Sequence, residues 1–225
     1  MNERILDLLI TSFPRILVMG LKVTIPLTLL AFAAGLFIAL VVAMIRELEI
    51  PVLSQICKLY VWIFRGTPLL VQLFIIFFGL PAVGITLDAF PAAVIAFSLN
   101  EGAYTSEIMR GAISAIPRGQ YEAGYSVGMN YFQIMRRIVL PQAFRVAFPP
   151  LFNELIALVK NTSLAASITV SEMFREAQKI AARTFEPFAL YCEVALIYLI
   201  ICTVLTRLQV YGEKRLSAFT GKRKI

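Results

Sequence analysis

Four acidic side chains lie inside otherwise apolar stretches of the chain, and they have the clearest capacity for chemistry. They are Glu101, Glu107, Glu154 and Glu193. A carboxylate is costly in hydrocarbon, so in a membrane helix it faces a polar partner or a polar pathway. The chain has no histidine and three cysteines. This composition excludes histidine-based triads and histidine-ligated zinc, and we predict neither a catalytic residue nor a metal site.

Long uncharged runs indicate the elements that position these carboxylates. Of the 225 residues, 59% are hydrophobic and 16% are charged, whereas a soluble domain is about half apolar and about a quarter charged. Residues 23–45 and 66–87 contain no charged side chain, and each run exceeds the roughly 20 residues that cross a bilayer as a helix. We predict an all-α integral membrane protein in which residues 1–225 form one transmembrane domain. Its five predicted spans cover about 16–45, 58–80, 88–115, 138–160 and 187–210.

The basic residues set the predicted orientation. Segment 110–137 carries four arginines against one glutamate, and the tail 207–225 carries six basic residues against one glutamate. Both segments are therefore cytoplasmic by the positive-inside rule, and five spans then place the N-terminus outside. The net charge of +7 fits such flanking positions, so we predict contact with membrane lipid and none with nucleic acid. Segment 161–186 is too polar to cross and is expected to form short helices over the outer face, with Ile168, Met173 and Ile180 toward the bundle.

The cytoplasmic segment has the composition of a short, rigid helix at about 119–130, lying parallel to the membrane. Pro117 ends the third span, because proline cannot continue a helix that it interrupts. Glu122 is expected in the first turn, where a carboxylate favours the positive end of the helix dipole. Gly128 suits the C-terminal end. The small residues Ala123 and Gly124 would let another surface approach closely.

The spacing within this segment resembles the EAA signature of ABC-importer permeases. That signature is Glu-Ala-Ala, three residues, Gly, nine residues and Ile-x-Leu-Pro, and here it reads Glu122-Ala123-Gly124, Gly128 and Ile138-Val-Leu140-Pro141. Gly124 replaces the second alanine and keeps its small size. The resemblance implies that ATPase subunits dock on Glu122, Ala123, Gly124, Gly128, Met129, Leu140 and Pro141.

Other stretches resemble the polar amino acid branch of these permeases, which includes transporters for histidine, glutamate, glutamine, arginine and cystine. They are 64–72 (FRGTPLLVQ), Asn100 with Ala103, Tyr104 and Glu107, and 160–165 (KNTSLA). The stretches 98–100, 164–166 and 174–178 look closest to L-cystine permeases. The resemblance covers roughly residues 15–215.

This resemblance implies a type I ABC importer permease in a bacterial cytoplasmic (inner) membrane. Two permease subunits, identical or paralogous, would surround the pathway, with two ATPase subunits below and an extracytoplasmic substrate-binding protein outside. The chain has no Gly-x-x-x-x-Gly-Lys-Ser/Thr phosphate loop, so ATP hydrolysis is expected on the partner, which would hold the ATP-Mg, and no cofactor on this chain. The expected function is the permease of an ATP-driven importer for a polar amino acid. The resemblance of three stretches to cystine permeases implies L-cystine as its cargo.

Six polar residues are candidates for the substrate pathway: Asn100, Tyr104, Glu154, Asn161, Thr162 and Ser163. Glu154 could touch the substrate's ammonium group or pair with Arg145 or Lys160. The other five could hydrogen-bond a zwitterion or make the polar contacts that join membrane helices. Arg65 could anchor its helix at the interface or pair with a carboxylate inside. The alternative function is an ion-gradient-driven secondary amino acid transporter using Glu101, Glu107 and Glu154 as ion sites.

Overall fold

The computed structural model describes residues 3–218, and this part of the chain is helical throughout, with short turns. The last basic residues counted above, Lys222, Arg223 and Lys224, lie outside the described residues. The elements in chain order are α1 (Glu3–Met19), η1 (Gly20–Thr24), α2 (Ile25–Glu47), α3 (Leu53–Gly66), α4 (Leu69–Phe74), η2 (Ile75–Gly79), η3 (Leu80–Val83), α5 (Ala89–Ser114), α6 (Arg118–Ser126), α7 (Tyr131–Ile134), η4 (Met135–Val139), α8 (Leu140–Asn161), η5 (Thr162–Ile168), α9 (Met173–Thr184) and α10 (Pro187–Ala218).

Three widened turns of π-helix interrupt the helices, and each ends two residues before a proline. They are η1 before Pro26, η2 before Pro81 and η4 before Pro141. A proline ring clashes with the carbonyl four residues earlier and leaves it without a hydrogen-bond donor. In all three cases that carbonyl belongs to the widened turn, so the π-turn accommodates the proline without breaking the helix.

The run predicted as one span over 58–80 is bent sharply. The α3 helix ends at Gly66, and the next helical stretch, Leu69–Val83, leaves it at an angle of 108°. Thr67 is extended, with φ −123° and ψ 148°, because a residue before proline is pushed out of the helical region. The prediction of a single uninterrupted helix over this run is therefore wrong, and Pro68 is the physical reason.

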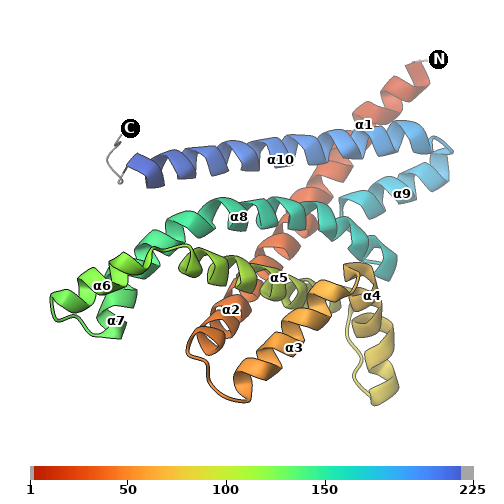
Figure 1. The fold of residues 1–225 in the computed structure, drawn as a ribbon. Coiled ribbons are helices and arrows are strands. Elements are labelled where there is room, and N and C mark those ends of the chain that lie inside the picture. The colour runs from red at the N-terminus through yellow and green to blue at the C-terminus, as the bar shows by residue number, and fades with distance from the viewer. Residues whose placement is uncertain (1–2, 219–225) are drawn as a thin grey trace.

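The α5 helix lies at the centre of the bundle. It packs along α2 over much of its length and also contacts α3, α4 and α8. Small, aliphatic and aromatic side chains from these helices form the largest core among the described residues, which includes Leu27, Leu73, Ala96, Phe97 and Leu158. In Figure 1, α10 lies alongside α8 and crosses α1, while α6 and α7 lie at the end of the bundle farthest from α9.

The α9 helix is fastened to the bundle by a fully buried carboxylate. Glu172 caps it by accepting hydrogen bonds from the backbone N–H groups of Phe174 (2.9 Å) and Arg175 (2.6 Å). The Tyr198 hydroxyl, on α10, donates to the same carboxylate at 2.9 Å. Ile168 and Met173 are fully buried and Ile180 is half-buried, so the apolar side of segment 161–186 faces the bundle as expected.

Two helical stretches in the described residues are long and apolar enough to cross a membrane. They are the continuous α1–α2 helix, Glu3–Glu47, and Pro187–Leu216 of α10. The bent pair of α3 and Leu69–Val83 makes a third if it counts as one span. The α5 and α8 helices have 26 and 22 residues, which is long enough to span, but they are less apolar than α2.

Candidate functional site

The α6 helix occupies the segment in which a short cytoplasmic helix was expected. Pro117 precedes it in an extended conformation, and Gly128 follows it with φ 77°. The N–H groups of Gly128 and Met129 donate back to the carbonyls of Tyr125 (2.9 Å) and Gly124 (3.1 Å). These two bonds close the C-terminus of α6, and glycine adopts the required positive φ without strain.

The position of Glu122 differs from its predicted place in the first turn. The α6 helix begins at Arg118, directly after the proline, so Glu122 is its fifth residue and lies beyond the reach of the dipole end. Its side chain is exposed, as are those of Ala123, Tyr125 and Val127. Glu122 is therefore available to a partner surface and does not stabilise the helix start.

Gly124 faces its own chain. A Cβ atom at this position would lie 2.6 Å from the Cγ1 atom of Ile134 and 3.4 Å from the Cδ1 atom of Ile138. The close approach that a small residue allows here is thus between α6 and the turn that leads into α8. Within Glu122-Ala123-Gly124, only the first two residues present their side chains outward.

Short-range contacts hold α6, α7 and the start of α8 together. Asn130 and Gln133 form a reciprocal capping box at α7, with bonds of 2.9 and 3.0 Å. Gln142, in the first turn of α8, donates to the Gln120 side chain at 3.1 Å. Leu140 and Pro141, which begin α8, are both exposed. We call residues 118–141 the coupling segment.

A second polar site holds the sharp bend between α3 and α4. The Gln72 amide nitrogen donates to the carbonyls of Phe64 (2.9 Å) and Thr67 (3.1 Å) and contacts the Thr67 hydroxyl at 2.8 Å. The Asn100 amide, on α5, donates to the Gln72 oxygen at 2.9 Å. Gln72 thus satisfies backbone carbonyls that the bend leaves free. The buried Asn100 side chain fastens Gln72, and with it the bend, to α5.

A third polar site gathers three arginines around Glu107. Arg46 from α2, Arg65 from α3 and Arg110 from α5 all pair with this carboxylate. The Arg110 contact is 3.0 Å and the Arg65 contact 3.9 Å, while the Arg65 guanidinium also lies over the Tyr104 ring at 5.4 Å. Arg65 thus pairs with a carboxylate although its own side chain is exposed. Nothing in the sequence indicated that Arg46 and Arg110 share one carboxylate with Arg65, because α2, α3 and α5 meet only in the folded chain.

The remaining pathway candidates separate by exposure. Thr162 is fully buried and its hydroxyl donates to the Val159 carbonyl at 2.6 Å. Tyr104, Glu154 and Asn161 are half-buried. Ser163 lines a cavity of about 300 Å³ with a mixed polar and apolar lining, together with Leu70, Leu164, Ala166, Ser167, Thr169, Phe174, Arg175 and Gln178. Asn100 and Thr162 are therefore buried against partners within the chain. The other four candidates keep some accessible surface, although Ser163 also donates to the Lys160 carbonyl at 2.7 Å.

Glu101 is a buried acid that the pathway prediction did not include. It is 3% exposed, and its Oε2 atom has no hydrogen-bond partner among the described residues. Its charge interacts with that of Glu154 on α8, which in turn interacts with Arg65. Two acids and one arginine from three different helices thus interact electrostatically, with Glu101 buried, Glu154 half-buried and Arg65 exposed.

Comparison with known proteins identifies the class of protein to which this chain belongs. Residues 35–218 match the family described as "Binding-protein-dependent transport system inner membrane component". The structure resembles a crystal structure of an amino acid ABC transporter with histidines, with a TM-score of 0.87 and 33% identity over 92% of this chain and 96% of that one. The MetNI methionine ABC transporter, at 20% identity and a TM-score of 0.69 over 96% of this chain and 99% of that one, shows the same fold.

Two individual relatives are permeases for named amino acids. The L-cystine transport system permease protein TcyB of Bacillus subtilis (strain 168) is 51% identical, over 96% of this chain and 93% of its own length. The glutamine transport system permease protein GlnP of Escherichia coli (strain K12) is 37% identical, over 85% and 88%.

This chain therefore belongs to the inner membrane components of binding-protein-dependent transport systems. It is the permease subunit of an ABC importer for polar amino acids, an integral protein of the inner membrane. It carries no ATPase or cofactor site of its own, because ATP is hydrolysed on a separate subunit of the complex. This assignment replaces the ion-gradient alternative.

Proposed function

We propose that this permease imports L-cystine. The supporting observation is its 51% identity to an L-cystine permease over 96% of the chain, compared with 37% to a glutamine permease. Cystine carries two ammonium and two carboxylate groups. A group of two acids and an arginine, Glu101, Glu154 and Arg65, is chemically suited to a zwitterion of this kind.

Uptake by the reconstituted complex tests the cargo. The permease is co-purified with its ATPase and its binding protein, placed in proteoliposomes, and supplied with ATP and radiolabelled L-cystine. We expect ATP-dependent uptake that unlabelled cystine abolishes and that glutamine, arginine and glutamate leave largely intact. Equal competition by glutamine or arginine would reject cystine as the preferred cargo while leaving the permease assignment in place.

The coupling segment is the proposed docking surface for the ATPase. Its exposed members include Glu122, Ala123, Gly128, Leu140 and Pro141. Gly124 is buried against Ile134, and Met129 is half-buried. An Ala123→Trp variant adds bulk to the exposed face of α6, and Ala115→Trp adds the same bulk to an exposed position before Pro117. We expect the first variant alone to lose co-purification with the ATPase. Retention of the ATPase by both variants would refute the docking surface.

The proposed topology has five spans over 16–45, 58–80, 88–115, 138–160 and 187–210, with the N-terminus outside and the C-terminus cytoplasmic. The bent pair then counts as one span, and α5 and α8 as two more. A second permease subunit, identical or paralogous, would complete the pathway, and a binding protein would dock outside. Single cysteines at Gly119 and Phe185, both exposed, in a chain without its three native cysteines test the orientation. An impermeant maleimide should label Phe185→Cys alone in intact cells.

Glu154, Tyr104, Asn161 and Ser163 are the proposed pathway contacts, because they combine polar groups with accessible surface. Asn100 and Thr162 would serve the pathway indirectly, by holding its frame. We expect Glu154→Gln to assemble normally and to lose most cystine uptake. Unchanged uptake in an intact Glu154→Gln complex would remove this residue from the pathway.

A further inference from the structure

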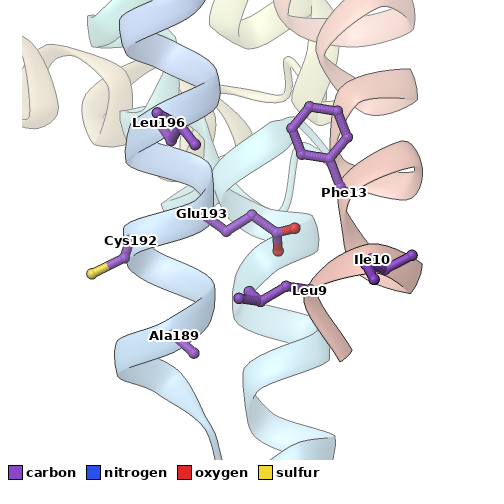
Figure 2. A pocket seen from close by; sticks show the side chains of 7 residues that line it. All are labelled: Leu9, Ile10, Phe13, Ala189, Cys192, Glu193 and Leu196. Carbon is purple, nitrogen blue, oxygen red and sulfur yellow. The ribbon is translucent and has the colours of Figure 1, made fainter. Parts of the chain in front are cut away.

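A groove between α1 and α10 lies apart from the pathway and the coupling segment. It has a volume of about 580 Å³ and is lined by Leu9, Ile10, Phe13, Ala189, Cys192, Glu193 and Leu196. Figure 2 shows Phe13, Ile10 and Leu9 on one side, the α10 residues on the other, and the Glu193 carboxylate pointing between the two helices. All the other lining side chains are apolar or weakly polar, which suits an acyl chain and not a soluble cargo.

The carboxylate in this groove has little compensation from the protein. Glu193 is 7% exposed, and Ser12 donates to its Oε2 atom at 2.6 Å. Within residues 3–218, no ion pair involves Glu193. A buried carboxylate with one hydroxyl partner keeps capacity for a cationic donor, and a charge-assisted hydrogen bond is about twice as strong as a neutral one.

The height of Glu193 in the membrane restricts what that donor can be. It lies six residues after the start of α10 at Pro187, which is about 9 Å along a helix. The α10 stretch long enough to span is Pro187–Leu216, so Glu193 lies near one end of it. This is the level at which lipid headgroups meet the hydrocarbon, and the apolar groove continues along α10 from Cys192 to Leu196.

We propose that this groove binds a phospholipid with a primary ammonium headgroup, such as phosphatidylethanolamine. The ammonium donates to the Glu193 carboxylate, and one acyl chain lies against Phe13, Ile10 and Leu196. An anionic phosphatidylglycerol would bring its phosphate toward an acid and has no cation to offset it. Phosphatidylcholine has a cationic choline group, but its quaternary nitrogen has no N–H donor. The chemistry of the groove therefore selects the ethanolamine lipid.

Quenching by brominated lipids tests this selection in the full-length protein. Trp62 is the only tryptophan, so a Trp62→Phe, Leu199→Trp chain carries a single reporter, because Leu199 is exposed on the side of α10 shared by Cys192 and Leu196. The chain is reconstituted in vesicles containing equal fractions of phosphatidylethanolamine and phosphatidylglycerol, with one or the other dibrominated. We expect stronger quenching by the brominated ethanolamine lipid.

Three further variants in the same background decide the outcome. Glu193→Gln should remove the preference, with about a tenfold loss of selectivity, because it deletes the charged acceptor. Glu3→Gln removes an exposed carboxylate of α1 and should leave the preference unchanged. Ala189→Phe should fill the groove and reduce quenching by both lipids. Equal quenching by the two lipids, or a preference that survives Glu193→Gln, would overturn the proposal. Weak quenching by both lipids in the parent chain would also overturn the proposal, since a second copy of the chain would then cover the groove.

Discussion

The coupling segment and the bend between α3 and α4 both interrupt an apolar chain, but they are held in different ways. The coupling segment is closed by bonds between near neighbours, such as Gly128 to Tyr125 and Asn130 to Gln133. The bend is held by Asn100 on α5, 36 residues away from Phe64 in the chain. A unit with local bonds can be displaced as one body, whereas the bend cannot change without changing its contacts to α5.

This difference suits the expected roles of the two regions in an importer. The coupling segment lies at one end of the bundle (Figure 1), where an ATPase could move it without unfolding it. The bend and the Glu107 cluster join α2, α3 and α5, so they can pass a movement to the helices around the pathway. Two contacts among the described residues link the regions. The Tyr131 hydroxyl lies 3.5 Å from the Glu47 carboxylate at the end of α2, and Ile134 and Val139 share an apolar cluster with Ala112 of α5.

The largest expected effect comes from removing the shared acid at the centre of the long-range contacts. Glu107→Gln leaves three arginines without their counter-charge, and we expect a loss of about 3 kcal/mol in the free energy of unfolding. Thermal unfolding of the purified chain in detergent measures this loss. Glu122→Gln, at an exposed position of the coupling segment, should change stability by less than about 0.5 kcal/mol. Similar losses in the two variants would erase the contrast between the regions.

The bend itself should be the next most sensitive position. Gln72→Leu leaves the Thr67 carbonyl without its side-chain donor, and leaves the Asn100 amide and the Phe64 carbonyl with only their 3.4 Å contact to each other. The expected cost is about 2 kcal/mol. Asn100→Leu should cost less, because Gln72 keeps its bonds to the bend. The double variant should cost clearly less than the sum of the single variants, since the pair shares a hydrogen bond. Strict additivity would show that Asn100 does not act through Gln72.

Within the coupling segment, the sensitive position should be the internal one. Gly124→Ala places a methyl group against Ile134, and we expect a loss of about 1 kcal/mol together with weaker ATPase stimulation. Gly119→Ala makes the same change in the same helix where no atom lies within 4 Å, and should be neutral or slightly stabilising. Unfolding midpoints of the two variants decide the matter, and a stable Gly124→Ala chain would mean that Ile134 moves aside freely.

Glu172 combines both kinds of contact and should give the smallest effect, visible as a pH dependence. Burial raises the pKa of this carboxyl group, although its bonds from Phe174, Arg175 and Tyr198 act in the opposite direction. The folded state therefore holds the proton more tightly than the unfolded state. The stabilising contribution of this group is full below its unfolded pKa and is lost as pH rises through the folded value.

Unfolding midpoints measured from about pH 4 to about pH 8 test this expectation. The Glu172→Gln chain should lose less stability with rising pH than the parent chain. Glu176→Gln, at a half-buried position in the first turn of the same helix, is the matched control and should keep the parent's slope. Identical slopes in all three chains would show that Glu172 does not titrate in this range.

Much of the coupling segment was predictable, because its signals are local. Pro117 and Gly128 stand at the two ends of α6, and each acts on the backbone through its own covalent structure. The π-turns before Pro26, Pro81 and Pro141 could have been anticipated on the same grounds. The bend at Pro68 could also have been expected, but the apolar run around it favoured a straight helix. Gly124 was predicted to face a partner, and only the fold revealed Ile134 against it.

The sequence by itself determined the membrane class, the helical architecture, the family and the short helix that is expected to meet the ATPase. These properties follow from hydropathy, from proline and glycine, and from the spacing of residues within about twenty positions. Only the tertiary structure decided that Asn100 holds the bend between α3 and α4, that three arginines share Glu107, and that the Glu193 carboxylate points into a groove beside α1. Each of these contacts joins helices far apart in the chain, and their partners become neighbours only when apolar packing brings those helices together.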